Sequence, residues 1–267
     1  MLLTDIRSHQ SYLARVRRTL ESVITVLHQN FGGADVLSEL CQMRGYTDSR
    51  MFAHLADKKV FRMPNLSDIQ ILMKNSLDAP TLRHLGLVDD AGNYFLEGRF
   101  AIPLRNYSGT PLALVCWYPD RRKYITTGTL GFTNTATFFN MDSYRQAFGF
   151  PDNISRAFVV EGIFDALSIS SLGYCALGNQ GLPLSPIKKE MLARFDEVYF
   201  IPDNDRPGRM SNKYLCTRSS HLWDTDNGHL IQITSSTCKD MDDVIKMGRL
   251  DNLDDWITDH KLLRVSI

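Results

Sequence analysis

The stretch "EVYFIPDND", residues 197–205, ends an apolar run with two aspartates two positions apart. Side chains at positions i and i+2 of extended backbone point the same way, so Asp203 and Asp205 are expected to face the same side. At about 4 Å, two carboxylates in a partly dry site repel each other by kilocalories. The pair therefore needs either full hydration or a positive charge between the two side chains.

The residues around this stretch alternate short apolar runs with helical segments. Strands that alternate with helices of this length are typical of a parallel α/β sheet. We therefore expect an α/β domain at 156–248, followed by a C-terminal helix or tail at 249–267. The expected strands lie at 157–162, 175–178, 197–201 and 229–234, and the expected helices at 163–173, 185–195, 207–220 and 241–248.

Upstream, the first 90 residues have a helical character. Apolar residues recur at helical spacing over 5–29, which predicts a long amphipathic helix. A break at Gly45 separates two further helices, and Thr47 or Asp48 is suited to cap the second of them. The apolar positions of the first helix are Leu13, Val16, Leu20, Val23, Ile24 and Leu27.

Residues 91–140 read as β structure. The segment alternates apolar and polar residues and turns at Ser108-Gly109, which predicts a hairpin. Residues 1–155 are therefore expected to form an α+β subdomain that precedes the parallel sheet, helical over 1–90 and rich in strands over 91–140.

Composition excludes several classes of protein. The chain has 267 residues, 43% of them apolar and 22% charged, as in ordinary globular proteins. No stretch approaches the ~20 apolar residues of a membrane span, and Asp5 and Arg7 interrupt the region where a signal peptide is apolar. We therefore expect a cytoplasmic protein without membrane association. The zero net charge argues against a globally basic nucleic-acid binder, but it leaves local patches open.

Cysteine and histidine spacing gives no sign of a zinc site. The five cysteines lie far apart without a Cys-x-x-Cys pair, and the seven histidines are scattered. Neither a zinc ribbon nor a disulfide framework is indicated.

Three acidic groups each lie at the end of an expected strand or after it. Glu161 ends the strand at 157–162, Asp203 and Asp205 follow the strand at 197–201, and Asp240 and Asp242 come after the strand at 229–234. Ligands of an open parallel sheet bind outside the carboxyl ends of its strands. A single Asp-x-Asp is most often a solvated turn. The joint pattern favours an oxygen-rich site for Mg²⁺ or Mn²⁺.

At these residues the sequence resembles the Toprim domain, the metal-binding α/β module of DnaG-type primases, topoisomerases, OLD-type nucleases and RecR-like repair proteins. Its signature is a Glu-Gly after the first strand and an Asp-x-Asp after a later one. Glu161-Gly162 and Asp203-Asn204-Asp205 match this signature and lie forty-two residues apart.

The surrounding residues resemble the primase branch of that family. "VVEGIFDALSI", "PDNDRPGR" and "CKDMDDVI" are similar to primase stretches, and Asp165 lies at a matching acidic position. Upstream, "GRFAIPLRNYSGTPLALVCWY" and "RKYITTG" extend the similarity, which runs from about residue 35 to 247. The sequence departs from the family at 116–118, where Cys-Trp-Tyr stands in place of Gly-Gly-Arg.

The resemblance implies synthesis of short RNA primers on single-stranded DNA from nucleoside triphosphates. It implies Glu161, Asp203 and Asp205 as catalytic residues, and these three together with Asp240 and Asp242 as ligands of Mg²⁺ or Mn²⁺. Candidate contacts to template or triphosphate are Arg99, Arg105, Lys123, Tyr124 and Lys239. Lys239 is suited either to orient a carboxylate or to meet a phosphate.

The implied partners are single-stranded DNA and nucleoside triphosphates in a bacterial cell. Neither the zinc-ribbon module of bacterial primases nor a helicase domain is found in the sequence. A replicative helicase or a separate template-recognition module is therefore an expected partner. The short chain is compatible with a phage or mobile-element source. Two alternatives stay open: a Toprim-type metal-dependent nuclease, and a non-catalytic replication adaptor that keeps the fold.

Overall fold

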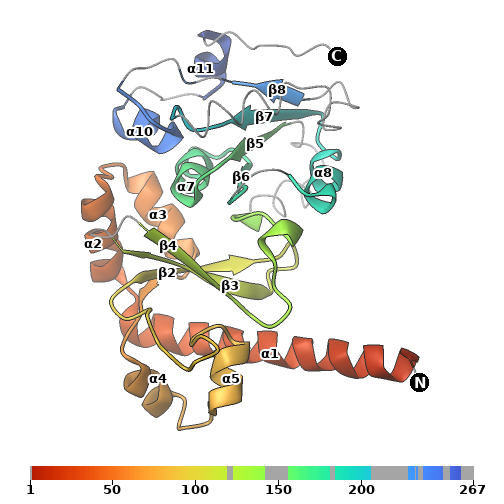
Figure 1. Cartoon of the computed structure of the whole chain (residues 1–267). Coiled ribbons are helices and arrows are strands. Elements are labelled where there is room, and N and C mark those ends of the chain that lie inside the picture. Colours follow the sequence, from red (N-terminus) through yellow and green to blue (C-terminus); the bar gives the residue numbers. More distant parts are fainter. Residues whose placement is uncertain are drawn as a thin grey trace. The chain divides into compact units, whose positions relative to one another are not determined.

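A computed structural model describes residues 2–118, 123–141, 156–180, 184–205, 228–231, 233, 237–248 and 253–259. The chain divides into two compact units, Met1–Thr133 and Asn134–Ile267 (Figure 1). Each unit has its own sheet and core. The domain boundary expected at residue 155 stays a prediction, and the helix expected at 207–220 lies outside the described residues.

The helices of the first unit follow the apolar spacing of the sequence. The long α1 buries Val16, Leu20, Val23, Ile24 and Leu27 against the sheet of this unit, as predicted. The break at Gly45 is confirmed, because this residue ends α2 in the left-handed region at φ 75°. Asp48 caps α3 by accepting a hydrogen bond from the Arg50 backbone N–H at 2.8 Å. The helices are α1 (Leu2–Phe31), α2 (Ala34–Arg44), α3 (Ser49–Asp57), α4 (Leu66–Leu72) and α5 (Ala79–His84).

The sheet of the first unit is antiparallel, in the order β1-β2-β3-β4. Its central hairpin turns at the predicted Ser108-Gly109, where Gly109 takes φ 81°. The strands are β1 (Phe61–Arg62), β2 (Phe100–Arg105), β3 (Pro111–Tyr118) and β4 (Lys123–Gly128).

The second unit contains the predicted parallel sheet, in the order β6-β5-β7-β8. The α/β fold class is therefore confirmed, with helices beside the sheet (Figure 1). The strands are β5 (Arg156–Val160), β6 (Ala176–Gly178), β7 (Glu197–Ile201) and β8 (Gly228–Leu230). The helices are the short 3-10 helix η1 (Asn134–Ala136), α7 (Ile163–Ser171), α8 (Pro186–Leu192), α10 (Met241–Lys246) and α11 (Leu253–Asp259).

The core of the second unit explains why its strands are almost wholly apolar. Alternate residues of β5 and β7, Ala157 and Val159 with Val198 and Phe200, join one cluster of buried side chains. Their neighbours Phe158 and Tyr199 are also buried and stack on each other, with ring centroids 5.2 Å apart. A parallel sheet covered on both faces requires such continuous apolar runs.

Two other expectations concern membranes and cysteines. In the part of the chain that the structure describes, no helix is both long enough and apolar enough to cross a membrane. Cys41, Cys116 and Cys238 are buried free thiols, and Cys175 is half-buried.

Candidate functional site

The edge of the parallel sheet brings two of the three acidic groups together. Val160 at the end of β5 lies opposite Ile201 at the end of β7, so Glu161 and the 202–205 loop leave the sheet at the same edge. The backbone N–H of Asn204 donates to the carbonyl of Lys239, and the Asn204 amide donates to the Cys238 carbonyl at 3.3 Å. These bonds tie the third acidic segment to the loop that holds Asp203 and Asp205.

Lys239 supplies the positive charge that the aspartate pair requires. Its Nζ lies 2.9 Å from Asp203 Oδ2 and 3.4 Å from Asp205 Oδ2. Burial raises the pKa of Asp203 more than any other cause, and the hydrogen bond and charge of Lys239 act in the opposite direction. The same carboxylates raise the pKa of the Lys239 ammonium, although burial opposes the shift. The lysine side chain is 54% exposed, so solvent reaches this ion pair.

Glu161 is a carboxylate with only partial compensation. Its Oε1 is buried and finds no hydrogen-bond partner among the described residues. Burial raises the pKa of this group most strongly, and the charges of Asp203 and Asp205 raise it further, while a hydrogen bond from the Asp203 backbone N–H and the charge of Lys239 lower it. A buried acceptor without a partner is costly, and it is suited to receive a cation.

Asp240 begins α10 as its N-cap, accepting from the Asp243 backbone N–H at 2.9 Å. Burial, followed by the charges of neighbouring aspartates, raises the pKa of Asp240 to about 6. Asp240 therefore caps α10, and its carboxylate is also repelled by the charge of Asp203.

Asp242 is bound within the packing between α10 and α7. It is 1% exposed, accepts from Ser168 Oγ at 2.6 Å and pairs with Lys246 Nζ at 2.5 Å. Its backbone N–H donates to Asp165 Oδ1 at 2.9 Å. These contacts fix α10 on α7 and leave Asp242 less available than Asp203 for a cation.

Asp165 explains the glycine of the Glu-Gly pair. Its carboxyl is buried, and burial, followed by the charges of Asp240 and Asp242, raises its pKa well above the ordinary value. A Cβ placed on Gly162 would lie 2.2 Å from Asp165 Oδ2. A larger residue at this position would therefore have to displace the Asp165 carboxyl from the place where it accepts the Asp242 N–H.

The residues present suit a hard divalent cation. Among the described residues, no three acidic, histidine or cysteine side chains converge closely enough to hold a metal ion. Lys239 lies between two of the candidate ligands. The unpartnered Glu161 oxygen and the acidic set around it are nevertheless the oxygen donors that Mg²⁺ and Mn²⁺ bind. A cation that took the place of the Lys239 ammonium would give the Glu161 oxygen a partner and would also neutralise the charges of Asp203 and Asp205.

The candidate contact residues of the first unit have varied surroundings. Arg105 pairs with Glu21 and donates to the Gly109 carbonyl at 2.7 Å. Arg99 is buried and donates through Nε to the Phe95 carbonyl at 3.0 Å. Tyr124 is 42% exposed on β4, and the Lys123 side chain lies outside the described set. Their role in binding template or triphosphate stays a prediction.

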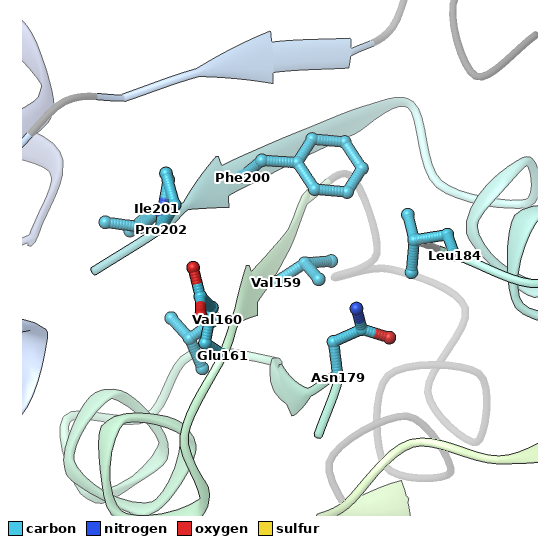
Figure 2. A pocket seen from close by; sticks show the side chains of 8 residues that line it. All are labelled: Val159, Val160, Glu161, Asn179, Leu184, Phe200, Ile201 and Pro202. Atoms are coloured by element: carbon cyan, nitrogen blue, oxygen red, sulfur yellow. The ribbon is translucent and has the colours of Figure 1, made fainter. Parts of the chain in front are cut away.

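A small recess of about 20 Å³ adjoins Glu161 at the same sheet edge. Figure 2 shows Glu161 and Asn179 beside it, with the apolar side chains Val159, Leu184 and Phe200 forming much of the lining. Asn179 follows β6 and is fixed by the buried Lys188 of α8. The sequence gives no signal for Lys188, because a lysine on a short helix is ordinarily exposed.

Comparison with known proteins agrees with this architecture. A family model described as Toprim-like matches residues 158–245. Among solved structures, the RNA polymerase domain of Mycobacterium tuberculosis primase DnaG superposes with a TM-score of 0.72 at 18% identity, covering 94% of this chain and 84% of that one. The E. coli primase catalytic core gives 0.70 at 17% identity, covering 92% and 80%.

A third structure is a DnaG primase catalytic domain bound to single-stranded DNA. It superposes with a TM-score of 0.72 at 18% identity, covering 94% of this chain and 81% of that one. None of the curated proteins matches the chain. The chain thus contains a Toprim domain and has the fold of the DnaG primase catalytic core.

The raised pKa of Asp240 predicts that this carboxyl lowers the stability of the folded protein in a pH-dependent way. The unfolded carboxyl loses its proton near pH 4 and the folded one near pH 6, so the charged group destabilises the folded protein as pH rises through this window. Asparagine keeps the N-cap without the charge. In metal-free buffer at pH 7.5, Asp240→Asn should raise the free energy of unfolding by on the order of 1–2 kcal/mol, and with it the melting temperature. At pH 4 the melting temperature should be nearly unchanged.

The matched control is Asp196→Asn, an exposed carboxylate that precedes β7 at the opposite sheet edge. It should change the melting temperature little at either pH. An equal gain from Asp240→Asn at both pH values would show that the charge of Asp240 is not the cause.

The Lys239 ion pair predicts a metal-dependent effect on stability. Lys239→Met leaves Asp203 and Asp205 without their counter-charge, so it should destabilise the metal-free protein by on the order of 1 kcal/mol at pH 7.5. Added Mn²⁺ should remove the difference, because the ion replaces the missing charge. Thermal unfolding with EDTA and with Mn²⁺ measures both effects, with Lys189→Met as the control. A deficit that Mn²⁺ leaves unchanged contradicts this prediction.

Proposed function

We propose that this protein synthesises short RNA primers on single-stranded DNA by divalent-metal-dependent nucleotidyl transfer. The observation that supports it most is the unpartnered buried oxygen of Glu161, beside Asp203 and Asp205, within the fold of a primase catalytic core. The fold limits the choice of chemistry, and the site provides the carboxylates that such chemistry needs.

Glu161, Asp203 and Asp205 are the proposed catalytic residues and, with Asp240 and Asp242, the proposed ligands of Mg²⁺ or Mn²⁺. A bound divalent ion would neutralise triphosphate charge and favour attack by a primer 3′-hydroxyl. The chain's own contribution is to hold these carboxylates at one rigid sheet edge, through the parallel pairing of β5 with β7 and the N-cap of α10.

Lys239 and the basic residues of the first unit are the proposed phosphate contacts. Once a cation replaces its charge between Asp203 and Asp205, the exposed Lys239 ammonium becomes available to a triphosphate oxygen. Arg99, Arg105, Lys123 and Tyr124 are the proposed contacts for template or nucleotide.

The proposed partners are single-stranded DNA, nucleoside triphosphates, and a replicative helicase or a separate template-recognition module. A solved DnaG domain of the same fold carries single-stranded DNA, which supports the first of these. The proposed location is the cytoplasm of a bacterial cell, and a phage origin is compatible with this role.

A primer-synthesis assay tests the proposal directly. The protein is incubated with single-stranded DNA, labelled ribonucleotides and Mg²⁺ or Mn²⁺, and short RNA ladders are expected without loss of the DNA. Asp203→Asn should lower the yield by more than about 100-fold, since removing even a residue that only orients a metal ligand costs about 10–100-fold. Asp196→Asn should leave the yield unchanged.

The other outcomes separate the alternatives. Shortened DNA without RNA ladders would identify a nuclease that uses the same carboxylates. No product from the wild-type protein, with replication in cells insensitive to Asp203→Asn, would identify a non-catalytic adaptor.

A further inference from the structure

Lys188 is a buried lysine for which the described residues supply no acidic partner. Its residue is 3% exposed, and no described carboxylate contributes to the shift of its pKa. Its ammonium lies 4.9 Å from the centroid of the Phe138 ring, and burial lowers its pKa to about 8. Burying an ammonium in this way is costly, so the hydrogen bonds that it makes require an explanation.

Among the described residues, both hydrogen bonds of the ammonium go to one residue. Lys188 Nζ donates to the Asn179 main-chain carbonyl at 2.7 Å and to Asn179 Oδ1 at 2.9 Å. One donor group therefore fixes both the backbone and the side-chain orientation of Asn179. In Figure 2 the amide of Asn179 lies at the recess beside Glu161, with its nitrogen directed toward Val159.

Asn179 and its neighbour are in turn bonded to the end of β5. The Asn179 backbone N–H donates to the Val160 carbonyl at 2.8 Å, and the Gln180 N–H donates to the Glu161 carbonyl at 3.1 Å. These are the two residues at which the first acidic group leaves the sheet. A displacement of Asn179 would therefore be passed to Glu161 through main-chain bonds.

We propose that Lys188 is a positioning residue of the acidic site, which acts through Asn179 and Gln180 to hold Glu161 where it can bind a divalent cation. The inference rests on the proposed metal site. It adds to that site Lys188 of α8, which contacts no acidic side chain among the described residues.

Stability alone does not account for a lysine at this position. Lys188→Met removes a buried ammonium, which is favourable, but it also leaves the two Asn179 acceptors without this donor, which is costly, so the two effects on stability oppose each other. Lys188→Met should therefore leave the melting temperature close to that of the wild type, while the Asn179 loop loses its anchor. A purely structural role would change the melting temperature and the metal affinity together.

The experiment measures Mn²⁺ affinity by the electron paramagnetic resonance signal of free Mn²⁺, with thermal unfolding measured for every variant. Lys188→Met should weaken Mn²⁺ binding by about 10-fold, the lower end of the effect of residues that orient metal ligands. Asn179→Ala, which removes one of the two acceptors, should weaken it by a smaller factor and serves as the test if Lys188→Met does not fold. Lys188→Arg should bind Mn²⁺ more tightly than Lys188→Met.

Lys189→Met is the matched control, because it removes the neighbouring and less buried ammonium of the same helix. It should bind Mn²⁺ as the wild type does. Wild-type affinity in folded Lys188→Met overturns the inference, as does a weakening that appears only in variants whose melting temperature has fallen. If the wild type and Glu161→Gln show the same Mn²⁺ binding, the proposed metal site itself is wrong.

Discussion

The repulsion between carboxylates at one sheet edge is the constraint on which the second unit depends. Burial raises the pKa values of Glu161, Asp165, Asp203 and Asp240, and the neighbouring acids raise them further. Each shift is a free-energy cost of keeping the group charged in the folded protein. The fold tolerates this cost because Lys239, Lys246, Ser168 and backbone N–H groups are placed against the acids. Because the clustered acids cost stability and do not add to it, the arrangement is typical of a binding site.

The parallel sheet is what makes such a concentration of charge achievable. Val160 and Ile201 are paired in register, so the segments that follow the two strands begin at the same carboxyl edge of the sheet. The continuous apolar runs of β5 and β7 allow both faces of the sheet to be buried. Gly162, which has no Cβ, leaves room beside the start of α7 for the buried Asp165 carboxyl. Rigid elements thus hold groups that would otherwise move apart.

Much of this arrangement could be predicted from the sequence, since periodicity and strand ends are local properties. The helix over 5–29, the hairpin turn at Ser108-Gly109 and the parallel sheet are confirmed, because each depends on spacing within a few residues. The sequence also predicted that Asp203 and Asp205 would need either full hydration or a positive charge between them. It did not specify that Lys239 would fill this place, because a contact across more than thirty residues depends on how the loops meet. Lys188 was missed for a related reason: its burial follows from the packing of α8, which helical spacing does not reveal.

The two lysines that touch the aspartates differ in a way that divides the acidic set. Lys246 is 18% exposed and pairs with a carboxylate that is 1% exposed, so separating them would leave a buried charge unpaired. Lys239 is 54% exposed and pairs with Asp203 and Asp205, whose side chains are 16% and 35% exposed, so separating it from them costs less. A cation can therefore exchange with Lys239 far more readily than with Lys246. This asymmetry favours Glu161, Asp203 and Asp205 as the exchangeable half of the site, and gives Asp242 the task of holding α10 in place beneath it.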